Sequence, residues 1–135
     1  VIKTLSIKIS GKGLHDITPV VRAEVASGGA DEGLCSLFIQ HTSASLLIQE
    51  NYDPSARVDL ECWLDRLGPE GDPLFTHTAE GADDMPAHIK AALTATSVSI
   101  PVIGGSLALG SWQGIFLWEH RRYRGNRNVI LHVSG

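Results

Sequence analysis

Short apolar runs separated by turn residues constrain this fold more than any other feature of the chain. Short runs dense in apolar residues are typical of buried strands, and "TLSIKIS" alternates as a half-buried strand does. Connections such as "HTS", "GGS" and "YRGNR" are too short for the crossover that a parallel pair needs, so antiparallel pairing is favoured. The expected strands lie in "TLSIKIS", "GLCSLFIQ", "ASLLIQE", "SVSIPVI", "LALGSWQGIFLWEHRR" and "NVILHVS".

Three other segments have helical signals. Thr18 is expected to be the N-cap of a first helix with Pro19 at its first position, and Val21 and Val25 follow at helical spacing. The second helix is expected to start at Asp53 and Pro54, with apolar Leu60, Trp63, Leu64 and Leu67 before Gly68. The third is expected from Pro86 to about Thr94. Strands joined by turns, with helices between some of them, predict an α+β fold.

The length, net charge and cysteine content of the chain limit both the number of domains and the possible functions. A chain of 135 residues suits one domain, residues 1–135. Its net charge of −4 argues against non-specific binding of nucleic acid, although Arg121, Arg122, Arg124 and Arg127 could form a local basic patch. No apolar run reaches membrane-spanning length and no signal-peptide pattern is found, so no membrane partner and a cytoplasmic location are expected. Cys35 and Cys62 stand in apolar surroundings and are predicted to be buried thiols rather than a disulfide or a zinc pair.

The segment "HTAEGADDMPAHIKAAL", residues 77–93, is the first candidate site. Asp84 and His88 are four residues apart, so they share a face if the helix begins near Asp84. A carboxylate there can orient an imidazole as a general base or metal ligand, and His77 could fold over the same helix start. The alternative is structural, because Asp83 and Asp84 are both good helix caps.

Two further segments are candidates. "QHTSAS", Gln40 to Ser45, places polar residues between apolar runs, and a hairpin turn and a pocket lining are equally consistent with it. In "GSWQGIFLWEHRR", Trp118 is expected in the core, whereas Trp112 stands beside glycines at the strand start and is more open to a functional role.

Taken together, these motifs resemble the YjbQ-like family, also labelled secondary thiamine-phosphate synthases. The matching segments include "GLCSLFIQHTSASLLIQEN", "HTAEGADDMPAHIKAAL" and "LALGSWQGIFLWEHR", and they span essentially the whole chain. The resemblance implies a two-layer sandwich of antiparallel β-sheet with about three helices, assembled as a homotrimer with sites at subunit boundaries. The motif polar residues are then His41, Thr42, Glu50, Asp53, His77, Asp84, His88, Trp112, Gln113 and Glu119.

The resemblance also implies residue roles and a reaction. Catalytic roles fall to His41, Asp84, His88 and Glu119. Substrate binding falls to Thr42, Trp112 and Gln113. A divalent metal, zinc or magnesium, would be held by His41, His77 and His88. The implied reaction joins a hydroxymethylpyrimidine diphosphate to a thiazole phosphate with release of pyrophosphate. A non-catalytic module that binds a metabolite or metal, and a purely structural role for the histidines, are the alternatives.

Overall fold

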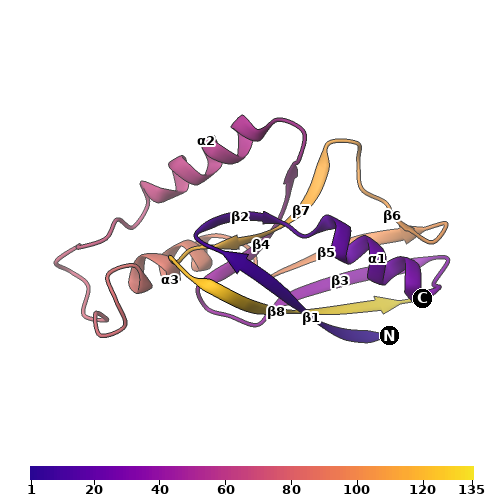
Figure 1. Cartoon of the computed structure of the whole chain (residues 1–135), viewed down its shortest axis with the longest axis horizontal. Coiled ribbons are helices and arrows are strands. Elements are labelled where there is room, and N and C mark those ends of the chain that lie inside the picture. Colours follow the sequence, from indigo (N-terminus) through magenta and orange to yellow (C-terminus); the bar gives the residue numbers. More distant parts are fainter.

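The computed structural model describes residues 1–135 as eight strands and three helices (Figure 1). Every strand pair is antiparallel, which confirms the predicted α+β class. The helices are α1 (Thr18–Gly28), α2 (Pro54–Asp65) and α3 (Asp84–Leu93). The strands are β1 (Ile2–Ser10), β2 (Gly13–Asp16), β3 (Gly33–Ile39), β4 (Ala44–Glu50), β5 (Ser97–Ile103), β6 (Ser106–Leu107), β7 (Gln113–Glu119) and β8 (Arg124–Ser134).

The strands form two curled sheets, and the three strands of the smaller sheet follow the same order as the strands of the larger sheet to which they are connected. The first sheet runs β1-β8-β3-β5-β6, and the second runs β2-β7-β4. Each strand of the second sheet is joined by a short connection to its counterpart in the first: β1 leads to β2, β3 to β4, and β7 to β8. The sheets are therefore two parts of one bent arrangement. The bend lies at residues 11–12, 40–43 and 120–123, and the second and third of these connections carry candidate site residues.

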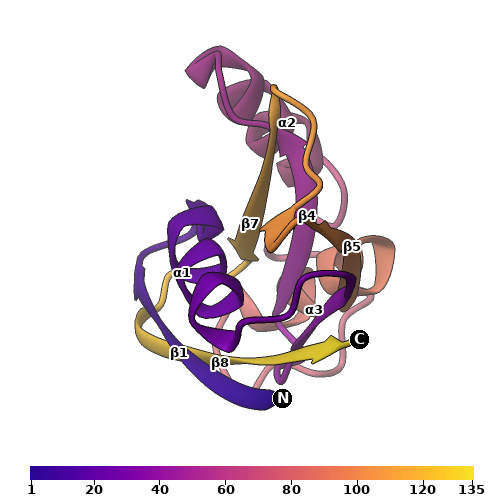
Figure 2. The same ribbon diagram turned by 90° about the vertical axis from the view of Figure 1, so that its right-hand side faces the viewer.

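One apolar core fills the inside of the curl. It is a single cluster of 19 buried side chains drawn from both sheets and from α1. The alternation predicted for β1 is confirmed, because Leu5, Ile7 and Ile9 are buried. Val21 and Val25 of α1 are buried as predicted, and Figure 2 shows α1 lying between the β1–β8 side and the β4–β7 side of the molecule.

The first helix begins differently from the prediction. Ile17 is the N-cap and Thr18 is the first helical residue, so the prediction of Thr18 as cap is wrong by one position. The buried Thr18 hydroxyl bonds the β7 backbone instead. It accepts from the Ile115 N–H at 2.8 Å and lies 3.4 Å from the Ile115 carbonyl, to which it donates. A hydroxyl has one donor and two acceptor sites, so it can satisfy both backbone groups.

The second helix projects from the body of the protein (Figures 1 and 2). Asp53 caps it as predicted, and its carboxylate accepts from the Ser55 N–H at 2.9 Å. Of the apolar stripe that predicted the helix, Leu64 is buried, Leu60 and Leu67 are partly buried, and Trp63 is 59% exposed. Cys62 on this helix is exposed, which corrects the prediction of a buried thiol, whereas Cys35 is buried and neither forms a disulfide.

Strand pairing corrects three further expectations. The runs before and after "HTS" do not form a hairpin: β3 pairs with β5 and β8, and β4 pairs with β7 in the other sheet. "YRGNR" is not a turn throughout, because β8 already begins at Arg124. Strand β2 lies in "GLHD", where no strand was predicted. Helix α3 also starts at Asp84, two residues before the predicted start.

Candidate functional site

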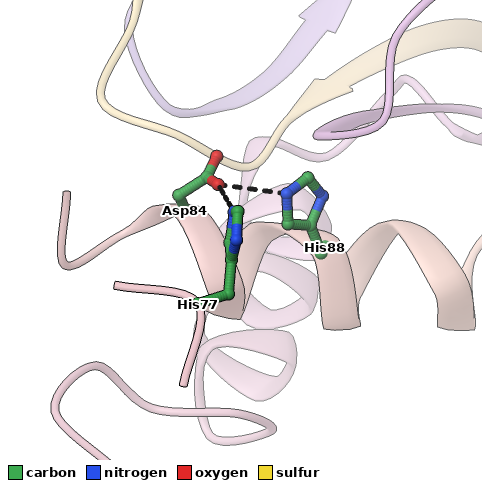
Figure 3. A group of neighbouring side chains, drawn as sticks. All are labelled: His77, Asp84 and His88. Carbon is green, nitrogen blue, oxygen red and sulfur yellow. Dashed lines mark hydrogen bonds and ion pairs between the residues drawn. The ribbon is translucent and has the colours of Figure 1, made fainter. Parts of the chain in front are cut away.

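Three titratable side chains meet where α3 begins (Figure 3). Asp84 is the first residue of α3, His88 follows one turn later on the same face, and His77 approaches from the loop between α2 and α3. The Oδ2 atom of Asp84 lies 2.7 Å from His77 Nε2 and 3.0 Å from His88 Nε2. The prediction that Asp84 and His88 share one face of the helix is confirmed. We name the group of His77, Asp84 and His88 the His–Asp–His centre.

The protons in this centre are restricted by the backbone. His88 Nδ1 lies 3.0 Å from the Thr42 carbonyl oxygen, which can only accept, so Nδ1 carries a proton. In a neutral His88 ring, Nε2 then has a lone pair aimed at the Asp84 carboxylate. Two acceptors at 3.0 Å repel unless a positive charge lies between or on them. Either His88 is doubly protonated, or a cation binds between Nε2 and Oδ2.

Asp84 is held rigidly as an anion. Its side chain is only 4% exposed, and its Oδ1 atom lies 3.2 Å from Arg121 Nη1. Burial raises the pKa of this carboxyl, but the hydrogen bond from His77 and the charges of His88 and Arg121 outweigh burial, so the pKa lies below its ordinary value. The carboxylate therefore remains charged at neutral pH and offers Oδ2 to a cation.

Arg121 connects the bend of the sheets to the start of α3. Asp83 occupies the N-cap position, but its side chain makes no capping bond. It accepts instead from the Arg121 guanidinium at 3.2 Å and from the Arg122 backbone N–H at 2.9 Å. Asp83 therefore stands at the cap position that the structural alternative gave it but makes no capping hydrogen bond, and Asp84 is the first helical residue. The predicted basic patch is largely neutralised, since three of its four arginines pair with carboxylates, namely Arg121, Arg122 and Arg127.

His41 precedes Thr42, whose carbonyl contacts His88, but His41 is outside the group of donor atoms formed by His77, Asp84 and His88. Its Nδ1 atom accepts from the Ser43 backbone N–H at 3.1 Å, and that N–H can only donate. The neutral ring must therefore carry its proton on Nε2, which makes Nε2 a donor rather than a metal ligand. Burial and the charge of Arg127 lower the pKa of His41, which favours this neutral form.

Glu119, predicted to be catalytic, is fully buried at the bend. Its two carboxylate oxygens accept from Arg127 Nε at 2.7 Å and Arg127 Nη2 at 2.9 Å, and its side chain has no exposed area. The same arginine lies 3.4 Å from the Ser43 hydroxyl. Within the single chain, the contacts of Glu119 hold Arg127 beside Ser43.

Trp112 and Gln113 are at the opposite end of β7 from the centre. Gln113 and Glu119 are the two ends of β7 and six positions apart, which corresponds to roughly 20 Å at about 3.3 Å per residue. Trp112 is 57% exposed and packs edge-on against Tyr52, with ring centroids 4.5 Å apart. Within one chain the structure does not bring these two predicted substrate-binding residues to the histidines.

Two more motif residues stand at the start of α2. Glu50 accepts from the Asp53 backbone N–H at 3.3 Å, and Asp53 caps the helix. Hydrogen bonds from Ser55 lower the pKa of Asp53. Local structure therefore accounts for both carboxylates.

The His–Asp–His centre fits a divalent metal. The donor atoms of His77, Asp84 and His88 all lie within 4.8 Å of one another. Tetrahedral zinc with bonds of about 2.0–2.1 Å needs donors about 3.3 Å apart, so small side-chain movements would suffice. The Thr42 carbonyl orients His88 in the way that outer hydrogen bonds orient metal-binding histidines. Magnesium, which prefers an all-oxygen octahedron, fits this donor set less well.

A cavity adjoins the centre on the His77 side. It measures about 230 Å³ and is lined by loop residues and by Met85 of α3. Phe75 and His77 contribute to its wall, so a small molecule in it would lie against the exposed His77 ring.

Arg121, Thr42 and Arg127 are the site residues whose contacts the sequence did not indicate. Arg121 and Asp83 are 38 residues apart, and Thr42 and His88 are 46 apart. No local spacing connects such pairs. The run of arginines after Glu119 is the only sequence signal near these contacts, and it indicates a basic patch rather than ion pairs with particular carboxylates.

The fold and the site together define a class: a small α+β protein with two curled antiparallel sheets and a histidine–aspartate centre at a helix start. None of its three helices has the length and apolar character needed to cross a membrane. The chain belongs to the YjbQ family, because the family profile described as "UPF0047 protein YjbQ-like" matches residues 3–135.

Relatives from distant organisms support this assignment. The UPF0047 protein sll1880 of Synechocystis is 51% identical over 97% of this chain and 89% of its own length. The UPF0047 protein YjbQ of Escherichia coli O157:H7 is 41% identical over 98% of this chain and 96% of its own. A conserved hypothetical protein of Thermus thermophilus is similar in structure, with a TM-score of 0.87, 32% identity and coverage of 98% and 99%. A hypothetical protein of Aeropyrum pernix has a TM-score of 0.90 at 27% identity, covering 100% of this chain and 98% of that one.

Proposed function

We propose that this protein is a metal-dependent enzyme acting on a small phosphorylated metabolite, with the His–Asp–His centre as its metal site. The observation that carries the proposal is the proton arrangement of His88. Its Nδ1 proton is committed to the Thr42 carbonyl, so in the neutral ring the Nε2 lone pair faces the Asp84 carboxylate. A divalent cation resolves this opposition, and a bound zinc or similar ion supplies Lewis acidity toward phosphate oxygens.

The surrounding residues have separable tasks in this proposal. Thr42 fixes the orientation of His88, and Arg121 fixes Asp84. His41, with its proton on Nε2, donates a hydrogen bond to a substrate oxygen that gains negative charge. The buried Glu119 holds Arg127, and the Arg127 guanidinium contacts the Ser43 hydroxyl. This contact keeps Ser43 in the position from which its backbone N–H donates to His41 Nδ1.

The substrate pair suggested by the family resemblance is a hydroxymethylpyrimidine diphosphate and a thiazole phosphate. The thiazole nitrogen attacks the pyrimidine methylene carbon, the bond from that carbon to the diphosphate oxygen breaks, and pyrophosphate leaves with the bonding electrons. No general base is needed, because the thiazole nitrogen already has a free electron pair. Charge uptake by the leaving diphosphate is the demand that the site must meet.

A homotrimer belongs to the same proposal. Trp112 and Gln113 are about 20 Å from Glu119 within one chain. They can contribute to the site only if a neighbouring subunit presents them, with the exposed Trp112 ring stacking on the pyrimidine. Sedimentation analysis of the purified chain tests the assembly, and a monomer at working concentration would remove Trp112 and Gln113 from the site.

The variant His88→Ala tests the proposal, with His132→Ala, an exposed histidine on β8, as the matched control. We expect His88→Ala to lower zinc affinity at least tenfold in calorimetry and to abolish product formation, while the metal-free thermal midpoint changes little. Product assays use the pyrimidine diphosphate and thiazole phosphate pair. Equal turnover in His88→Ala would refute the catalytic proposal. Saturable zinc or substrate binding without any product would favour the alternative, a non-catalytic binding module.

A further inference from the structure

A second polar cavity lies on the other side of α3 from the His–Asp–His centre. Successive helix residues are about 100° apart, so Pro86 and Lys90 face away from Asp84 and His88. The cavity measures about 130 Å³. Its lining residues are Lys12, Gly13, Glu61, Leu64, Asp65, Lys90, Trp118 and His120.

Two lysines in this cavity share one carboxylate oxygen. Lys90 Nζ lies 2.7 Å and Lys12 Nζ 2.8 Å from the same Asp65 Oδ1 atom. The Lys90 side chain is only 5% exposed, and Asp65 is the only acceptor found for it. An ammonium has three donors, so a buried one with a single partner retains unused capacity for an anion.

Asp65 is an easily replaced partner. It is the last residue of α2, where the negative end of the helix dipole disfavours a carboxylate. Its side chain is 47% exposed, and α2 buries only Leu64 against the body. The half-exposed Asp65 carboxylate can therefore turn toward solvent while the buried Leu64 keeps the end of the helix in place.

His120 adds a defined acceptor to the same cavity. The Thr94 hydroxyl donates its one proton to the Lys90 carbonyl, so in the Ser45–Thr94 bond the Ser45 hydroxyl is the donor. Ser45 must then accept from His120 Nε2, at 2.8 Å. Burial, with the charges of Lys90 and Lys12, lowers the pKa of His120 to about 3, so the ring is neutral and Nδ1 carries a lone pair.

We propose that this cavity is a binding site for a small oxyanion, whose place between Lys12 and Lys90 is held by the Asp65 carboxylate until the anion binds. The volume suits a phosphate group or a short carboxylate and is well below the roughly 300 Å³ at which pockets for larger ligands begin. A protonated oxygen on the anion can donate to His120. Binding displaces the Asp65 carboxylate from Lys12 and Lys90 toward solvent.

The experiment measures inorganic phosphate binding by calorimetry and by thermal midpoint, at constant ionic strength with chloride and with EDTA present. We expect Asp65→Ala to bind phosphate at least tenfold more tightly than the wild type, because the internal competitor is gone. In chloride alone the variant should melt lower than the wild type, and phosphate should restore it. Asp59→Ala, an exposed carboxylate on the same helix, is the control and should behave as the wild type. Asp65→Asn, which keeps the side-chain size, replaces Asp65→Ala if the latter does not fold.

Two comparisons decide the result. The double variant D65A/K90M should lose the gained affinity, and the gain should survive in D65A/H88A, since the two sites are on opposite faces of α3. Malonate run in parallel distinguishes a carboxylate ligand from a phosphate ligand. The proposal would be overturned if the wild type and Asp65→Ala bound phosphate with equal affinity. It would also be overturned if D65A/K90M bound phosphate as tightly as Asp65→Ala does. Neither result bears on metal binding at His88.

Discussion

Replacing Glu119 with alanine separates a structural role from a catalytic one. The carboxylate is fully buried and both of its oxygens bind Arg127, at 2.7 and 2.9 Å. Its Oε2 also accepts from the Arg121 backbone N–H at 3.2 Å. Truncation would leave the Arg127 guanidinium, itself 8% exposed, buried against only Ser43 and the face of the Tyr123 ring.

The expected cost follows from that geometry. Removing one partner of a buried ion pair costs about 3–5 kcal/mol, because the remaining charge stays in a medium of low polarity. For a chain of this size, such a loss lowers the melting temperature by roughly 10–20 °C. Urea denaturation followed by far-UV circular dichroism measures the free energy of unfolding, with protein concentration held constant because assembly would add its own stabilisation.

The double replacement E119L/R127M is the matched control. It removes both charges together and fills the space with apolar side chains, so we expect it to be more stable than Glu119→Ala alone. The reasoning is refuted if Glu119→Ala has wild-type stability. Wild-type stability combined with lost turnover would instead restore the catalytic role that the family resemblance implies for Glu119.

Three other outcomes follow from the structure. The pKa of Asp84 is lowered on folding, so its stabilising contribution is present above about pH 4 and is lost as the pH falls below that value. The stability of the metal-free protein, measured as the pH is lowered, should show this loss, and the loss should be smaller in Asp84→Asn. Iodoacetamide should label Cys62 and spare Cys35 in the native protein, because Cys62 is exposed while burial raises the pKa of Cys35 to about 11; mass spectrometry of the peptides reads this, and equal labelling would contradict it. Thr18→Val leaves the Ile115 N–H without its partner and should cost about 1–3 kcal/mol in urea denaturation, whereas an unchanged midpoint would show that bond to be dispensable.

Local patterns were sufficient for much of the secondary structure. The period-two alternation in β1, the cap and proline at Asp53 and Pro54, and the valines of α1 were each interpreted correctly from neighbouring residues. The Asp84–His88 pair was also predictable, since residues four apart share a helix face wherever the helix extends over both. The resemblance of several motifs to one family identified the family correctly over residues 3–135.

The tertiary structure decided the pairings that join distant residues. Whether β3 and β4 form a hairpin depends on the bend at residues 40–43, and apolar composition is the same for either arrangement. The bend also brings Arg121 to Asp83 and Thr42 to His88. Exposure of Cys62 depends on how little of α2 packs against the body, a property of its surroundings and not of its periodicity. Backbone periodicity depends on residues a few positions apart, so it can be predicted from the sequence. Burial, ion pairing and proton positions depend on groups that only the folded chain brings within a few ångströms of one another.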